Sequence, residues 1–213
     1  MLCASKIVRF RGIKPEIRIL GLDDGAFVPR TVGKADVVGV VFRGGHWLDG
    51  VMRTEVTIDG LDATEKISSM VTESPHYEQL RVLMLGGITF AGFNVVDIRK
   101  LFESTSLPVI ALARENPDLD GVRRALENLP DQAVRWRAVE SAGDVFQVKV
   151  RSDIAPVYAQ VAGVSMGDTE RIVRLSCTRS GFPEPLRVAH MIASSLSKAD
   201  FQLAGMKKFK SLG

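Results

Sequence analysis

The chain has 213 residues, of which 46% are hydrophobic and 25% charged, so it can bury a full core and is not expected to be disordered. Its two cysteines are too few for a disulfide framework or a zinc site, and no apolar run reaches the length of a membrane span. The formal net charge of +3 permits a nucleic-acid partner without requiring one. We therefore expect a cytoplasmic protein with no membrane partner, folded as a single domain over residues 1–213 and ending in a short basic tail.

Three segments near the start of the chain have the patterns of β-strands. Residues 17–22 and 36–42 are nearly continuous apolar runs, which is typical of strands buried on both faces. Residues 51–58 alternate apolar and polar side chains, as a half-buried strand does. Because the three segments are close neighbours in the sequence, we expect them to form an antiparallel meander.

Helical and strand patterns alternate after the meander. Asp62 is predicted to cap a helix that runs to about Thr72, with Glu65 completing a capping-box pattern. The other predicted elements are strands at 80–85, 107–112 and 145–150 and helices at 95–104 (capped by Asn94), 119–129 and 184–197. Strands 80–85 and 107–112 flank a helix and should therefore be parallel. A meander followed by such a βαβ unit predicts an α/β fold of the ribonuclease H-like type, a mixed sheet with helices on both faces.

Two adjacent carboxylates stand where the first predicted strand ends. Asp23 and Asp24 follow an apolar strand directly and precede Gly25. Carboxylates at the end of a rigid buried strand are suited to holding a divalent metal ion. The same three residues also favour a simple turn, so this segment alone leaves both interpretations open. Side-chain alternation along a strand implies that only one of the two carboxylates faces a given side of the sheet.

The expected fold brings two further loops to the same edge of the sheet. In a sheet of this order the first and fourth strands are parallel neighbours, so the turn at 59–62 and the loop at 86–94 should lie near Asp23. The glycines of the 86–94 loop allow close backbone approach to a base or phosphate, or serve only a tight chain crossing. The candidate substrate contacts in this loop are Gly87, Thr89, Gly92 and Asn94. Asp97 either joins the metal ligands or complements the dipole of the following helix.

Several of these motifs resemble those of a known family. The matching segments are 17–25, 40–51, 58–65, 87–97 and 183–190, within a region of resemblance from about residue 13 to residue 200. The chain resembles a mainly archaeal domain family of unknown function that is similar to endonuclease V and belongs to the ribonuclease H-like fold. The resemblance implies Mg²⁺ or Mn²⁺ as cofactor and DNA or RNA as partner.

The resemblance also implies roles for individual carboxylates. The first metal-binding position of endonuclease V matches Asp23, with Asp24 as the alternative, and the second matches Asp62, with Asp59 as the alternative. Asp23 and Asp62 are the expected catalytic residues, and Asp24 and Asp97 are further candidate metal ligands. At the third position, where that family has an aspartate, this chain has Gly86, which has no side chain to bind a metal.

The late motif 183–190 supplies the remaining candidates. The resemblance suggests that Glu184 and Arg187 face the site, with Arg187 contacting substrate. His190 lies in an apolar stretch, so we expect a core or partly buried histidine rather than a catalytic base. Three functions stay open on these residues: a metal-dependent endonuclease for deaminated or structured strands, a nucleic-acid-binding protein that has lost cleavage, and a nucleotide or small-ligand domain.

Overall fold

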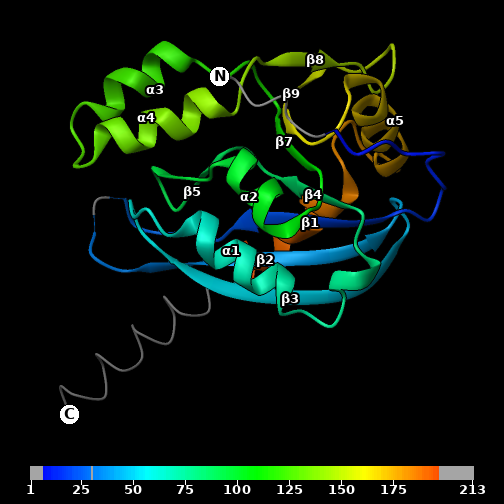
Figure 1. Cartoon of the computed structure of the whole chain (residues 1–213), viewed down its shortest axis with the longest axis horizontal. Coiled ribbons are helices and arrows are strands. Elements are labelled where there is room, and N and C mark those ends of the chain that lie inside the picture. Colours follow the sequence, from blue (N-terminus) through cyan, green and yellow to red (C-terminus); the bar gives the residue numbers. More distant parts are fainter. Residues whose placement is uncertain (1–6, 30, 197–213) are drawn as a thin grey trace.

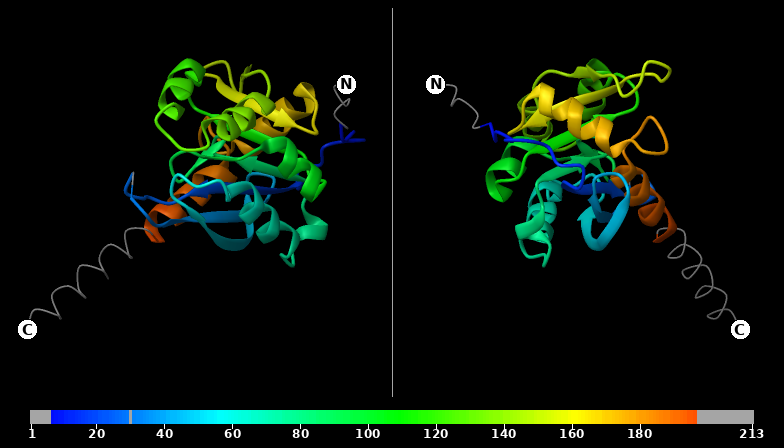
Figure 2. Two further views of the ribbon diagram at one scale, coloured as in Figure 1. Left: turned by 60° about the vertical axis from the view of Figure 1, so that its left-hand side comes forward. Right: turned by 90° about the vertical axis from the view of Figure 1, so that its right-hand side faces the viewer.

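A computed structural model describes residues 7–29 and 31–196 of the chain. The basic tail and Cys3, both noted in the sequence, lie outside these residues. A seven-stranded mixed sheet forms the centre of the molecule, with strand order β3-β2-β1-β4-β7-β9-β8 (Figure 1). Helices cover both faces of this sheet, as the sequence predicts (Figure 2). Within the described part of the chain, no helix combines the length and the apolar character needed to cross a membrane.

The meander forms as predicted. β1 (Arg18–Asp24) pairs antiparallel with β2 (Lys34–Arg43), and β2 pairs antiparallel with β3 (Trp47–Thr57). β3 begins four residues before the predicted strand, because the chain turns tightly at Gly44 and Gly45 and resumes pairing with β2 at Trp47. The result is a long ribbon that carries Asp23 and Asp24 at its end.

The βαβ unit is also confirmed. β4 (Val82–Leu85) pairs parallel with both β1 and β7 (Val109–Ala113), and α2 (Ile98–Thr105) connects β4 to β7. α1 (Ala63–Thr72) and the short helix η1 (Tyr77–Gln79) lead from β3 to β4. The carboxyl ends of β1 and β4 therefore meet at one edge, where the candidate site was expected.

Two details of the predicted helix starts are wrong. Asn94 does not cap α2: it pairs with Phe90 in a small hairpin of β5 (Thr89–Phe90) and β6 (Asn94–Val95), and Asp97 caps α2 instead. Asp62 occupies the N-cap position of α1 but makes no side-chain capping bond. The first amide of α1, that of Ala63, donates to Asn94 Oδ1 at 2.9 Å, so the cap comes from a residue distant in sequence.

The chain beyond residue 118 contains more structure than its sequence pattern predicted. α3 (Leu119–Leu126) is shorter than the predicted helix, and β8 (Phe146–Val148) lies within the predicted strand. Three further elements were not predicted: α4 (Gln132–Ser141), β9 (Val157–Ala162) and α5 (Met166–Ser176). Residues 184–196 are helical, in agreement with the predicted late helix, and are called the late helix below.

The two faces of the sheet bury different side chains of β1. Leu20 and Leu22 pack in the core beneath α1 and α2, whereas Ile19 packs in the core beneath α5. The late helix crosses this second face at Gly21, where a Cβ atom would lie 2.4 Å from the carbonyl carbon of Pro185. Gly21 therefore allows the helix to approach the strand closely, and this approach decides which residues of the helix reach the end of β1.

Candidate active site

Asp23 and Asp24 make their contacts on opposite faces of the sheet, as alternation along β1 requires, and both border the same cleft beyond the end of the strand. Asp24 Oδ2 accepts a hydrogen bond of 2.7 Å from the backbone N–H of Ala91, in the loop on the α1 side. Asp23 Oδ2 lies 3.0 Å from Nδ1 of His190, on the late helix. The end of β1 thus contacts both the 86–94 loop, through Asp24, and the late helix, through Asp23.

The environment of Asp23 raises the pKa of its carboxyl group. Its side chain is only 16% exposed, and burial together with the negative charge of Asp24 raises its pKa to about 6, against the opposing influence of His190. Burial also raises the pKa of Asp24, although the hydrogen bond from Ala91 counteracts this effect. Two carboxylates held in this way are suited to accepting a cation.

The sequence-based expectation for His190 is wrong. Its side chain is 64% exposed and faces Asp23, whereas the neighbouring Ala189 supplies the buried contact with β2. Ala189 and His190 are adjacent on a helix whose apolar face is turned to the sheet. A difference of one position along this helix therefore places one side chain in the core and the next in the cleft. Because the residues around His190 are mostly apolar, the sequence pattern did not indicate that this side chain is exposed.

An open cleft of about 610 Å³ surrounds Asp23 and His190. It is lined on one side by the end of β1 and by Gly86, and on the other by the late helix. Two arginines line it, Arg114 after β7 and Arg187 on the late helix. The cleft therefore combines a buried carboxylate, an imidazole and two guanidinium groups.

The two arginines are held by different contacts. The Arg114 guanidinium lies 4.0 Å above the ring centroid of Phe182, and within the described chain no carboxylate pairs with it. Arg187 donates from Nε and Nη2 to Oε2 of the buried Glu184, at 2.9 and 2.6 Å. Arg114 was missed by the sequence analysis, although it lies two residues after the predicted strand 107–112, whose end is at the same edge as Asp23.

A second cavity of about 570 Å³ adjoins the cleft and shares Gly86 and Arg114 with it. Gly87 and Thr89 line this cavity, opposite side chains from α3, α4 and β9. Gly92 and Asn94 lie outside its lining. Two of the four predicted substrate contacts of the 86–94 loop thus border a cavity that adjoins the cleft of Asp23.

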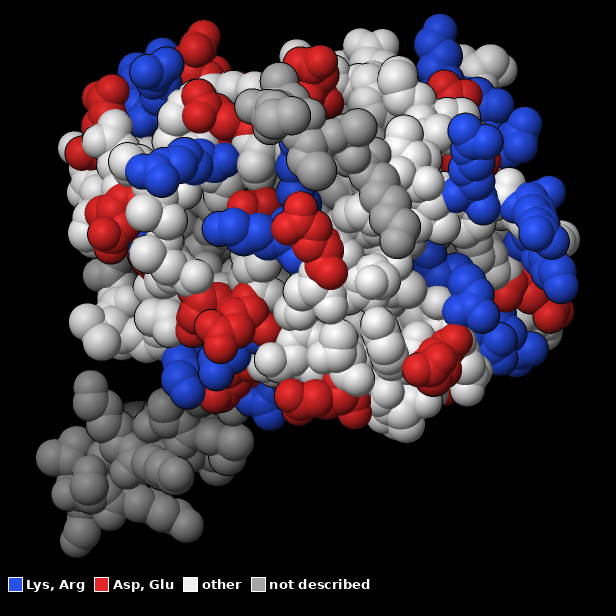
Figure 3. All heavy atoms as spheres, in the orientation of Figure 1, with Lys and Arg blue, Asp and Glu red and all other residues white. Residues whose placement is uncertain are grey.

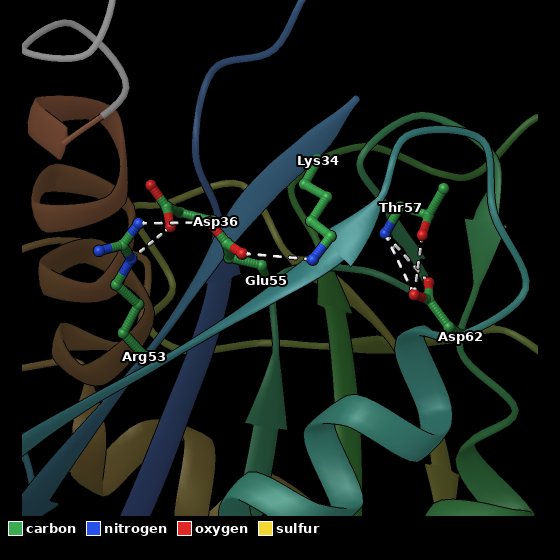
Figure 4. A network of polar contacts seen from close by, with 6 residues as sticks. All are labelled: Lys34, Asp36, Arg53, Glu55, Thr57 and Asp62. Atoms are coloured by element: carbon green, nitrogen blue, oxygen red, sulfur yellow. Dashed lines mark hydrogen bonds and ion pairs between the residues drawn. The ribbon is translucent and has the colours of Figure 1, made fainter. Parts of the chain in front are cut away.

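Asp62 does not line the cleft; its carboxylate is bonded to Thr57 of β3 (Figure 4) and to Asn94 of β6. Its carboxylate accepts from the backbone N–H and the hydroxyl of Thr57, at 3.1 and 2.9 Å, and from Nδ2 of Asn94 at 2.6 Å. Burial acts to raise the pKa of Asp62, but the hydrogen bonds from Asn94 and Thr57 outweigh it and lower the pKa. Asp62 and Asn94 together fix the turn before α1.

Asp97 also has local partners. Its Oδ1 accepts hydrogen bonds from the backbone N–H groups of Arg99 and Lys100 and from the hydroxyl of Ser141. It lines a smaller cavity between α1, α2 and α4 and does not line the Asp23 cleft. The structure therefore brings Asp23, Asp24 and Arg187 together and leaves Asp62 and Asp97 on the α1–α2 side.

A divalent metal is the cofactor that the sequence resemblance implies. Among the described residues, no group of three or more His, Cys, Asp or Glu side chains is arranged to hold a metal ion. A Cβ atom on Gly86 would lie 2.8 Å from Oδ1 of Asp23, so the missing third carboxylate would have stood beside this residue. The residues present fit a single ion that takes few protein ligands and completes its coordination with water and phosphate oxygens. They do not fit a site with three carboxylates.

Comparison with protein families decides where the chain belongs. The model of the family described as endonuclease dU matches residues 15–197. The chain belongs to the endonuclease dU family. A UPF0215 protein of Methanothermobacter thermautotrophicus is 53% identical over 189 residues, which cover 88% of this chain and 91% of that protein.

Solved structures extend the comparison to the fold. The crystal structure of a protein of unknown function from Archaeoglobus fulgidus is 39% identical, with a TM-score of 0.76 over 84% of this chain and 98% of that one. Endonuclease V of Ciona intestinalis, in complex with a 24-mer DNA containing an inosine followed by a ribo-adenosine, has a TM-score of 0.54 at 13% identity, covering 91% of this chain and 87% of that one. This endonuclease dU family member therefore has the ribonuclease H-like fold of endonuclease V.

The outer surface carries charges of both signs. On the face shown in Figure 3, basic side chains gather on the side of α5, while acidic and basic groups are interspersed elsewhere. The loops that follow β1 and β4 lie toward the opposite side of the molecule (Figure 1). On this face, the basic side chains therefore gather away from the loops of the candidate site.

Proposed function

We propose that this endonuclease dU family member is a metal-assisted endonuclease that hydrolyses a phosphodiester bond in a strand carrying a deaminated base. The observation that carries the proposal is the contact between Asp23 and His190 in a cleft that two arginines also line. The family description names dU, and the DNA bound to Ciona endonuclease V contains inosine. Uracil and hypoxanthine are both products of base deamination, so we assign the same substrate class to this chain.

The arginines supply the binding of the phosphate. Guanidinium groups bind phosphate oxygens through paired N–H donors, and their charge offsets the charge that develops during hydrolysis. Arg114 is free of a carboxylate partner within the described chain, so its charge is available to a phosphate in the cleft. Arg187 shares its charge with Glu184 and acts mainly as an oriented donor.

Asp23 and His190 provide proton transfer and ion binding. When bound, Mg²⁺ or Mn²⁺ would acidify a water molecule and stabilise charge on the phosphate oxygens, and Asp23 with Asp24 is the oxygen donor set that would hold it. A neutral His190 that donates from Nδ1 to Asp23 has a lone pair on Nε2, which can take a proton from an attacking water. The Asp23 carboxylate fixes this tautomer and the orientation of the ring.

The loop after β4 contributes the contacts to the base. Gly87 has a φ of 105° and no atom within 4 Å of the position of a Cβ, so its backbone is open to a planar group in the second cavity. Thr89 adds a hydroxyl to the same cavity, and Gly92 and Asn94 hold the returning half of the loop. We propose that Asp62 and Asp97 act at a distance by fixing this loop and the start of α1. Neither carboxylate lines the cleft of Asp23.

One observation favours a second candidate, a nucleic-acid-binding protein without cleavage. Gly86 removes the third carboxylate, and the described residues contain no group of three metal-ligating side chains. Such a protein would bind a deaminated strand through Arg114 and Arg187 and leave it intact.

Cleavage and binding assays on one set of oligonucleotides distinguish these candidates. Single- and double-stranded DNA with one uracil, one inosine or no lesion, and RNA with or without one inosine, are incubated with Mn²⁺, Mg²⁺ or EDTA. We expect metal-dependent cuts near the lesion and none in the undamaged strand. Binding of the lesion strand without any cut, at saturating protein and with either metal, would support the second candidate instead.

A further inference from the structure

Two loops beside the candidate site contain non-glycine residues in the left-handed region of φ. Asp59, in the turn before α1, has a φ of 50°, and Ala91, in the 86–94 loop, has a φ of 45°. Such conformations are unfavourable for residues with a Cβ and persist only where the surroundings enforce them. The two residues are joined by a hydrogen bond of 2.9 Å from Asp59 N to Ala91 O. Asp59 Oδ1 also accepts a hydrogen bond of 2.9 Å from Phe93 N.

A buried arginine from α4 binds the backbone of both loops. Arg135 is 2% exposed, and its Nη1 donates to the carbonyls of Gly60 and Phe93 at 2.7 and 2.6 Å. Its Nη2 donates to the carbonyl of Asp59 at 2.6 Å, and Nε donates to that of Pro130 at 3.1 Å. All the hydrogen bonds recorded for this guanidinium within the described chain are thus to backbone carbonyls. Burying a charge in this way is costly unless several strong acceptors compensate, and a role in packing alone would not require it.

The loops that Arg135 binds are connected by hydrogen bonds to Asp23 and Asp24 at the end of β1. Ala91 N donates to Oδ2 of Asp24, and Asp24 N donates at 3.0 Å to Oδ1 of Asp23. A continuous series of hydrogen bonds therefore runs from the guanidinium, through Asp59 and Ala91, to the carboxylates at the end of β1. Bonds of this kind fix relative positions because each donor and acceptor has a preferred direction.

We propose that Arg135 is a positioning residue that clamps the 59–62 turn and the 86–94 loop in their strained conformations. The guanidinium is suited to this task because its N–H donors lie in one plane and diverge toward several carbonyls at once. A lysine at this position would keep the charge but would lack the planar array of donors. The consequence for substrate binding rests on the proposed function, whereas the clamp itself does not.

The clamp is tested by amide hydrogen exchange in three variants. Arg135→Lys keeps the charge, Arg135→Ala leaves a cavity, and Arg137→Ala changes an exposed arginine of the same helix as a control. We expect exchange of the Ala91 and Phe93 amides to accelerate about tenfold or more in both Arg135 variants, relative to amides of β4. Arg137→Ala should leave the ratio of loop to β4 exchange rates unchanged. Millimolar guanidinium should slow exchange of these amides in Arg135→Ala only.

Two results would overturn the clamp. The first is an unchanged ratio of loop to β4 exchange in a folded Arg135→Lys protein, since the loops would then keep their conformation without the guanidinium. The second applies if Arg135→Ala folds: equal acceleration of all amides, unaffected by guanidinium, would assign Arg135 to global stability alone.

A kinetic measurement extends the test to the proposed function. For cleavage of a uracil-containing strand, we expect the Arg135 variants to raise KM about tenfold or more while changing kcat much less, because the loop contacts the base and not the phosphorus. A selective fall in kcat with KM unchanged would contradict this positioning role. If the wild-type protein does not cleave, the proposed function fails, and the exchange experiment still decides on the clamp.

Discussion

Asp23 and His190 are 167 positions apart in the sequence and lie 3.0 Å from each other in the structure. Their contact depends on the close approach of the late helix to β1. Gly21 allows that approach, two residues before Asp23, because Pro185 occupies the space that a side chain would fill. A glycine in a buried strand thus helps to place an imidazole at the candidate site.

Gly21→Ala should therefore disturb both stability and the site. A Cβ atom would lie 2.4 Å from the carbonyl carbon of Pro185, and backbone cannot move aside as a flexible side chain can. We expect the free energy of unfolding to fall by about 1–3 kcal/mol, as in other overpacked cores, and the His190 ring resonances to shift. Urea denaturation and NMR measure the two effects. Gly167→Ala in α5, where no atom lies within 4 Å of the added Cβ, is the matched control. Equal behaviour of the two variants would contradict the role of Gly21.

The raised pKa of Asp23 predicts a specific pH dependence of stability. Burial and the charge of Asp24 raise this pKa from 3.8 to about 6 in the folded protein, so between these values the folded state binds more protons than the unfolded state. The free energy of unfolding should consequently decrease as pH rises from 3.8 through about 6. Asp23→Asn should reduce this decrease, and Asp49→Asn, which changes a carboxylate paired with Arg43, should retain it. Urea denaturation in EDTA at a series of pH values measures the slope, and an unchanged slope in Asp23→Asn would contradict the assignment.

Gly86→Asp tests whether this edge of the sheet holds a cation. The new side chain would start 2.8 Å from Asp23 Oδ1, which must shift slightly, and it would place a second negative charge beside that carboxylate. We expect Mn²⁺ affinity to rise and metal-free stability to fall through charge repulsion. Isothermal titration and thermal melts with and without Mn²⁺ follow the two effects. Gly86→Asn, similar in shape but uncharged, should gain far less affinity. The same Mn²⁺ affinity in wild-type, Asp and Asn proteins would argue against a metal site here.

Arg114→Met should weaken binding to nucleic acid and reduce its dependence on salt. Each phosphate contact with a single strand contributes about 0.7 to the slope of log K against log salt, so the loss of one contact should lower the slope by about that amount. Fluorescence anisotropy over a salt series gives both quantities. Arg123→Met is the control, because Arg123 also lies over an aromatic ring, that of Trp136, but does not line the cleft. Equal slopes for wild type and Arg114→Met would exclude a phosphate contact by Arg114.

The sequence pattern predicted the part of the fold that depends on local periodicity. Apolar runs and alternation identified β1, β2 and β4, and the rules for parallel strands then brought Asp23, the 59–62 turn and the 86–94 loop to one edge. α4 escaped prediction partly because its buried face includes Arg135, a residue type that normally marks a surface.

The details of the candidate site depend on contacts between distant segments, which periodicity cannot predict. Pro185 packs on Gly21, and this packing sets the orientation of the late helix that brings His190 to Asp23. The partners of Asp62 come from Thr57 and Asn94, and the latter pairs in a two-residue strand too short to leave a pattern. The position of Arg114, two residues after the predicted strand 107–112, was the one local signal available for a missed residue.

If hydrolysis takes place in the cleft around Asp23, removing the charge of this carboxylate must abolish cleavage. An end-labelled strand with a single uracil is incubated with Mn²⁺ and either wild-type protein, Asp23→Asn or Asp49→Asn, after circular dichroism has shown that all three are folded. We expect cleavage near the uracil by wild type and Asp49→Asn, with a loss of about a hundredfold or more in Asp23→Asn. Cleavage by Asp23→Asn at the wild-type rate would contradict this expectation.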